Sequence, residues 1–146
     1  MLSQKEADEL IELIKYLQQY NSVAIPSLGE KTQLIANSVE GEFIVDIRRG
    51  RIDVFQATFQ TRYKKNIPLI RLDLEGPEHQ NPDGMIIPCP HLHIYREGFD
   101  LKWAFPVETE ADSNFPDLGN LVQVLIDYLK YNNITSVPTN IIDSIL

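Results

Sequence analysis

The sequence is poor in the residues that mark secreted or membrane-spanning proteins. It has one cysteine among 146 residues, which excludes an internal disulfide and fits a reducing compartment. No apolar run approaches the roughly 18 residues that a membrane span requires. The N-terminal stretch is charged and amphipathic, unlike a signal peptide. We therefore predict a cytoplasmic protein with no membrane segment.

Basic residues are scarce as well. Thirteen Lys and Arg residues stand against 21 Asp and Glu residues, for a formal net charge of -8. This charge argues against an extended nucleic-acid surface, which would need a net positive field. Most of the basic residues nevertheless lie close together in the chain: Arg48, Arg49, Arg51, Arg62, Lys64, Lys65 and Arg71. They form either a local basic patch or solvated strand ends and hairpin tips, and we favour the second interpretation.

Helical patterns stand at both ends of the chain. Ser3 and Glu6 match a capping box, and apolar residues at helical spacing follow to about Tyr20. A second apolar period of this kind covers residues 118–131. The stretch 139–146 predicts a short terminal helix. The length fits one domain, residues 1–146, with a core of its own.

Between these helices the chain is rich in β-branched and aromatic residues that alternate with polar ones. Two such runs flank Arg49 and Gly50, where glycine allows the positive φ of a tight hairpin turn. Successive strands joined by short turns indicate antiparallel pairing. We predict an α+β fold with a mainly antiparallel sheet of about five to six strands. The N-terminal and C-terminal helices pack on one face of this sheet.

The stretch 71–106 holds all three histidines, the cysteine and the tryptophan. It begins within one predicted strand, LIRLDL, and contains a second, HLHIY, and alternate residues of a strand share a face. On the first strand, Arg71 and Asp73 lie opposite a buried face of Ile70, Leu72 and Leu74. On the second, His91, His93 and Tyr95 lie opposite Leu92 and Ile94. The loop between them carries His79. If the two strands are neighbours, these polar side chains converge.

The pair His91 and His93 has three interpretations. The first is a polar strand face whose imidazoles are merely hydrogen-bonded. The second is a metal site, with His79 or Asp73 as third ligand and one open position. The third is acid–base chemistry, because imidazoles titrate near neutral pH. We adopt the third, and predict neither a metal ion nor a cofactor.

In the acid–base interpretation each polar residue has a role. One strand histidine deprotonates the attacking 2′-hydroxyl of RNA, and His79 protonates the leaving oxygen. Arg71 neutralises phosphate charge through bidentate hydrogen bonds. Asp73 orients an imidazole and fixes its tautomer. Tyr95 donates a further hydrogen bond from the same face.

Cys89 has the strand parity of the histidines, so a cysteine–histidine nucleophile pair is conceivable. It stands between Pro88 and Pro90, and residues two apart on a strand do not easily form a nucleophile–base hydrogen bond. A structural thiol is the better interpretation.

The segments RLDLEGPEHQNPDG and PHLHIYREG resemble a pattern of bacterial toxin–antitoxin loci, the TumE-type toxins. In that pattern an Arg-x-Asp strand leads into a Pro-rich loop with a histidine and then into a His-x-His strand. The resemblance covers residues 71–98, and Asp73-Leu74 departs from the Asp-Asn of the pattern. The longer string HLHIYREGFDLKWAFP is similar to small proteins of bacteria and mobile elements. The resemblance implies a toxin directed at nucleic acid.

Two function classes follow. The first is a toxin-like, metal-independent ribonuclease that acts on RNA and pairs with an antitoxin protein. The alternative is a non-enzymatic acidic inhibitor, of the anti-defence type, that binds a protein partner through its negative charge. A purely structural module is a third possibility. The position of the charge distinguishes them: a basic rim around the histidines favours RNA, and a continuous acidic face away from them favours the inhibitor.

Overall fold

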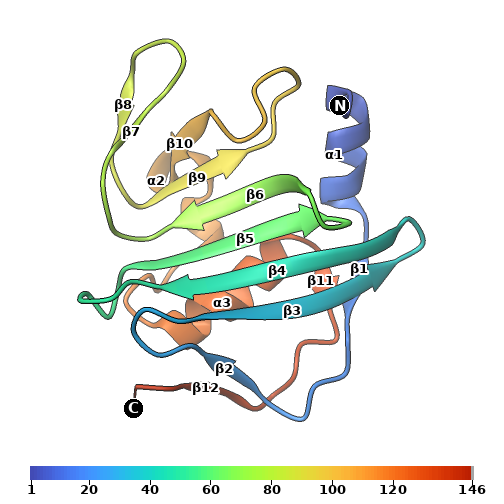
Figure 1. The fold of residues 1–146 in the computed structure, drawn as a ribbon, viewed down its shortest axis with the longest axis vertical. Helices are drawn as coiled ribbons and strands as arrows, with labels where there is room; N and C mark the ends of the chain where they lie inside the picture. Colours follow the sequence, from blue (N-terminus) through green and yellow to red (C-terminus); the bar gives the residue numbers. More distant parts are fainter. Residues whose placement is uncertain (146) are drawn as a thin grey trace.

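The computed structural model describes residues 1–145 and is built around one large sheet (Figure 1). The strands of this sheet are β1 (Lys15–Leu17), β3 (Lys31–Ser38), β4 (Gly41–Arg49), β5 (Ala57–Tyr63), β6 (Ile67–Asp73), β9 (His91–Ile94), β10 (Ala104–Pro106) and β11 (Ile134–Thr135). Their spatial order is β10-β9-β6-β5-β4-β3-β1-β11. All neighbours are antiparallel except β1 and β11, so the predicted class is confirmed, with a mixed sheet of 8 strands in place of five to six.

Two small strand pairs lie outside this sheet. The first is the parallel pair of β2 (Val23–Ile25) and β12 (Ile141–Asp143). The terminal helix predicted for residues 139–146 is therefore wrong over its described part, because Ile141–Asp143 add to the edge of β2. The second is a short hairpin of β7 (His79–Gln80) and β8 (Ile86–Ile87), of which β7 lies in the loop that was predicted to carry His79.

The helices are α1 (Gln4–Glu12), α2 (Val107–Glu110) and α3 (Leu121–Tyr131), with a 3-10 turn, η1, at Asp112–Asn114. The capping box of Ser3 and Glu6 forms as predicted. However, α1 ends at Glu12 rather than near Tyr20, because Lys15–Leu17 leave the helix to pair with β3 and β11. Ile14, which belongs to the predicted helical stripe, is exposed.

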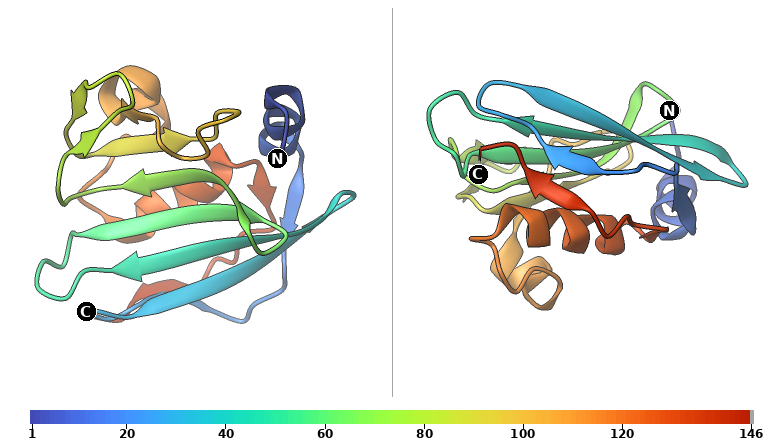
Figure 2. Two further views of the ribbon diagram at one scale, coloured as in Figure 1. Left: turned by 45° about the horizontal axis from the view of Figure 1, so that its top comes forward. Right: turned by 90° about the horizontal axis from the view of Figure 1, so that it is seen from below.

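The helices lie on one side of the sheet (Figure 2). Because strand residues alternate, one face of β4, β5 and β6 is apolar and packs beneath α3, whose buried side includes Val124, Leu125 and Leu129. A buried tyrosine on α3 also attaches to the sheet: the Tyr128 hydroxyl donates to Ile70 O at 3.2 Å and lies 2.9 Å from Thr61 Oγ1. The core therefore holds β5 and β6 rigidly and leaves their other face open.

The tight turn predicted at Arg49–Gly50 is a longer loop. β4 ends at Arg49, and β5 begins only at Ala57. Gly50 N donates to Gln56 O, which closes the loop across its base. Among residues 1–145, no helix combines the length and the apolar character needed to cross a membrane.

Candidate functional site

Two rows of polar side chains cross the open face of the sheet, each with one residue from each of five strands. Cross-strand pairing sets the rows, since directly opposed residues project from the same face. The first row is Lys31, Arg48, Thr58, Asp73 and His91, and the second is Gln33, Asp46, Gln60, Arg71 and His93. We call these ten residues the polar band. Much of it lines a depression of about 580 Å³ that ends at Arg71 and Asp73.

The histidine end of the polar band is covered. His91 and His93 are only 2% and 1% exposed although no helix lies on this face. The segment after β6 and the turn after β9 fold over them. Asn81 fixes this cover, because its side chain donates to Ala104 O at 3.0 Å and accepts from Ala104 N at 2.8 Å. A smaller pocket of about 260 Å³ remains, lined by His79, His91, His93, Arg71 and Asp73 among others.

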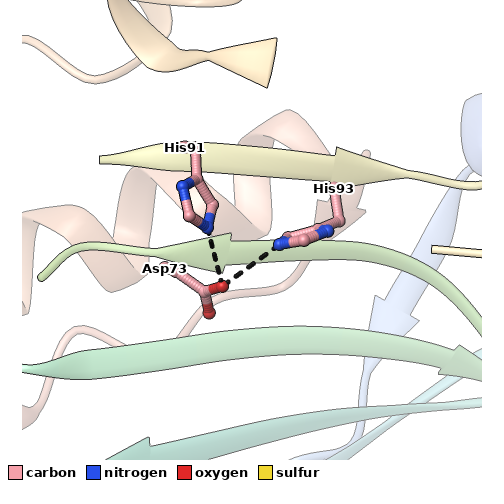
Figure 3. A group of neighbouring side chains, drawn as sticks. All are labelled: Asp73, His91 and His93. Atoms are coloured by element: carbon pink, nitrogen blue, oxygen red, sulfur yellow. Dashed lines mark hydrogen bonds and ion pairs between the residues drawn. The ribbon is translucent and has the colours of Figure 1, made fainter. Parts of the chain in front are cut away.

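Asp73 is the centre of the cluster beneath this cover (Figure 3). Its Oδ2 lies 3.1 Å from His91 Nε2 and 3.3 Å from His93 Nε2. Arg71 Nε lies 3.3 Å from the same carboxylate. The other oxygen, Oδ1, accepts a hydrogen bond of 3.1 Å from the Thr58 hydroxyl. Four side chains from three strands therefore converge on one carboxylate.

Backbone carbonyls face the outer nitrogens of both strand histidines. His93 Nδ1 lies 2.7 Å from Leu101 O, and His91 Nδ1 lies 3.2 Å from Ile87 O. A carbonyl oxygen only accepts, so each Nδ1 carries the proton. In a neutral ring the lone pair is then on Nε2. His93 Nε2 accepts from Arg71 Nη2 at 3.0 Å in this state.

Burial and the neighbouring groups together set the pKa values of Asp73 and His93. Burial alone would raise the pKa of Asp73, but its contacts with His91 and His93 and the charge of Arg71 outweigh burial and hold that pKa well below its usual range. Burial lowers the pKa of His93, and the charge of Arg71 adds to this, whereas Asp73 opposes it. Asp73 is therefore an anion and His93 a neutral ring at neutral pH.

Comparison with known proteins gives a family and no function. Residues 2–134 match DUF6978, a family of unknown function. The chain belongs to this family. No curated protein and no solved structure matches it. The match includes every residue of the polar band, so the site lies within the family's common region.

Two residues predicted for the site remain. His79 lies beside the strand histidines, and Tyr95 does not. The His79 ring centroid is 4.6 Å from that of His93 and 6.1 Å from that of His91, while His79 Nε2 contacts Lys102 O at 2.7 Å. Tyr95 belongs to the apolar core, and its hydroxyl donates to Leu2 O at 2.7 Å. β9 ends at Ile94, so the strand alternation that placed Tyr95 beside the histidines does not continue to it.

Cys89 lies 3.7 Å from His91 Nδ1, so the two side chains do meet. Burial, with the charges of Asp73 and Glu75, raises the pKa of the Cys89 thiol to about 11. A nucleophilic cysteine needs a lowered pKa. This environment favours the structural thiol.

The sequence patterns did not assign Thr58, or the four polar-band residues of β3 and β4, to the candidate site. Thr58 stands with Gln56 and Gln60 on the polar side of a clearly alternating strand, so the signal for its orientation was present. The missing information was that β5 lies directly beside β6, which brings Thr58 opposite Asp73.

Proposed function

We propose that this protein is an RNA-cleaving enzyme whose substrate lies along the polar band, with the scissile phosphate at the Asp73 pocket. The observation that carries the proposal is the position of positive charge. Although the chain has a formal net charge of -8, Lys31 and Arg48 are exposed neighbours on the open face, in the row that leads to Asp73. Phosphate contacts of this kind supply much of the affinity for nucleic acid.

Lys31 and Arg48 differ from Arg62, another basic residue that lines the same depression. Arg62 is held by Asp46, with Arg62 Nε at 2.6 Å and Nη2 at 2.9 Å from the carboxylate. Within residues 1–145, neither Lys31 nor Arg48 has an ion-pair partner. They are therefore available to an anionic ligand. This free positive charge supports RNA over the acidic-inhibitor alternative, although it lies at the end of the polar band opposite the histidines and not in a rim around them.

The chemistry is attack of a 2′-hydroxyl on the adjacent phosphorus. The P–O bond to the 5′ oxygen breaks, and a 2′,3′-cyclic phosphate and a 5′-hydroxyl form. One strand histidine, oriented by Asp73, accepts the proton of the attacking hydroxyl, Arg71 neutralises phosphate charge, and His79 gives its proton to the leaving oxygen. Arg71 is suited to its role because its side chain is 34% exposed beside the buried histidines. In a cell this activity would make the protein toxic, as the resemblance to TumE-type toxins implies.

The test uses purified protein with a single-stranded RNA and the DNA of the same sequence. We expect cleavage of the RNA alone and a cyclic phosphate end, since DNA lacks the attacking hydroxyl. His79→Gln is expected to slow cleavage by about 10²–10⁴-fold. Glu108→Gln, an exposed acid on α2 and so outside the polar band, is the control and should change the rate by no more than about twofold. Wild-type protein that neither binds nor cleaves RNA would contradict the proposal and favour the inhibitor alternative.

A further inference from the structure

We propose that Asp73, His91 and His93 bind one divalent first-row transition-metal ion. Metal binding stands on the geometry of these three side chains. Its consequence for catalysis rests on the proposed function: the RNA-cleaving site becomes metal-dependent, in place of the metal-independent chemistry expected from the sequence.

The carboxylate oxygen already has the spacing of a coordination site toward both histidine nitrogens. Tetrahedral ligands at zinc–nitrogen and zinc–oxygen distances of 2.0–2.2 Å lie about 3.3 Å from one another. Asp73 Oδ2 lies 3.1 Å and 3.3 Å from the two Nε2 atoms, and all three ligand atoms lie within 4.8 Å of one another. To bind one ion, the two Nε2 atoms take up the same spacing to each other by rotation of the imidazoles.

The second observation is the hydrogen bonding of the two rings. Ile87 O and Leu101 O accept from the Nδ1 atoms of His91 and His93, so both Nε2 lone pairs point toward the Asp73 carboxylate. Metal-binding histidines usually donate their other ring N–H to a carbonyl or carboxylate in this way. Two lone pairs and an anion meeting at one buried point repel each other unless a cation lies between them.

The ligand set indicates the class of ion. Imidazole nitrogen favours zinc, iron and similar ions over magnesium and calcium, which prefer oxygen ligands. Two histidines and one carboxylate leave coordination positions free for water or substrate, as catalytic sites do. The free side faces the pocket of about 260 Å³ that His79 and Arg71 also line.

Arg71 now supplies the cation at this point. Its Nη2 donates to His93 Nε2 at 3.0 Å, so it occupies a position that the ion would take. At 34% exposed, the Arg71 side chain has room to turn toward the open face. Metal binding would release Arg71 from His93 and leave its guanidinium free to hold phosphate.

The test is titration of metal-free protein with Co²⁺, followed by its visible absorption, and then displacement by Zn²⁺. We expect one ion per chain. Asp73→Asn and His93→Gln should each weaken binding by at least about 100-fold. Asp46→Asn is the matched control and should bind as the wild type does. Arg71→Met should bind at least as tightly as the wild type, because it removes the competing cation.

Circular dichroism of each variant shows whether it has folded, and Asp73→Asn, at a partly exposed position, serves if the buried His93→Gln does not fold. No binding to the wild type, or equal binding to Asp73→Asn, overturns the metal site. RNA cleavage that a chelator stops and Zn²⁺ restores supports its catalytic role. Chelator-resistant cleavage leaves the proposed function standing and overturns that role. Metal binding without any RNA cleavage leaves the metal site standing and overturns the proposed function.

Discussion

Two partly buried arginine–aspartate pairs of this molecule are built differently. At the first, Arg49 donates to both oxygens of Asp143, at 2.5 Å and 3.1 Å. Its remaining bonds go to Val54 O at 2.8 Å and Pro26 O at 3.2 Å. One cation meets one anion, and the pair joins β12 to the end of β4. This is a structural ion pair.

At the second place, one carboxylate has several partners besides its arginine. Asp73 faces Arg71 and two imidazoles, and backbone carbonyls fix the outer nitrogen of each ring. A buried ion pair alone therefore does not mark a functional site, and we assign that role to the pair at which two imidazoles also converge.

The largest expected difference is in RNA cleavage. Asp73→Asn should lower the rate by roughly 10³-fold, since it removes the carboxylate that orients the strand histidine acting as base. Asp143→Asn should change it by no more than about twofold, measured at a temperature at which the variant remains folded. Single-turnover rates on one RNA give both values. Equal losses in the two variants would remove the distinction between the sites.

The free energy of unfolding should show the opposite order, with the larger loss in Asp143→Asn. Asp143→Asn leaves the charge of Arg49 buried without its partner and should lower the free energy of unfolding by about 3 kcal/mol. Asp73→Asn should lower that of the metal-free protein by less than about 2 kcal/mol, because the new amide can donate to an Nε2 lone pair. Urea denaturation at neutral pH measures both. A larger loss for Asp73→Asn would mean that its cluster is mainly structural.

Acid should weaken the structural pair. Hydrogen bonds from Arg49 hold the pKa of Asp143 below its usual value. A carboxyl whose pKa is lowered in the folded state stabilises the fold above its unfolded pKa of about 3.9, and this contribution is lost as the pH falls. The stability difference between wild type and Asp143→Asn should thus shrink below about pH 4. A difference that stays constant from pH 7 to pH 3 would contradict the assignment.

The smallest expected effect concerns the rim of the polar band. Arg48→Gln should weaken RNA binding by only a few fold and reduce the salt dependence by about one unit of slope, as loss of one phosphate contact does. Lys130→Gln, an exposed charge on α3 and so on the helix side of the sheet, is the control. Fluorescence anisotropy with a 2′-deoxy oligonucleotide at several salt concentrations measures binding without cleavage. Equal effects of both substitutions would mean that the polar band is not the binding surface.

Local sequence patterns predicted much of the fold. The alternation in β6 correctly placed Ile70, Leu72 and Leu74 in the core and Arg71 and Asp73 on the opposite face. The capping box set the start of α1, and the apolar period at 118–131 corresponds to α3. Such patterns succeed because burial of one face is a local requirement that each strand or helix must meet by itself.

Pairing between strands that are distant in the sequence decided where α1 ends. Lys15–Leu17 continue the helical period of α1 but form a strand, since the edges of β3 and β11 offer hydrogen bonds on both sides. Lys15 is fixed there by its ammonium group, which donates to Ile11 O, Leu13 O and Asn132 O at 2.7–3.0 Å. The partner strands and Asn132 come from distant parts of the chain. A helical pattern also does not show which carbonyl oxygens a lysine will reach, so the sequence could not indicate this strand.

The sequence by itself determined which residues the site could use. It grouped the histidines with Arg71 and Asp73 within one stretch and gave His91 and His93 the same face of a strand, because side chains alternate along any strand. Only the tertiary structure decided that β9 lies beside β6, which sets His91 opposite Asp73 and His93 opposite Arg71. It also decided that a loop buries both rings, and that Tyr95 turns into the core. Strand order and loop cover depend on contacts between distant segments, and no local pattern specifies those contacts.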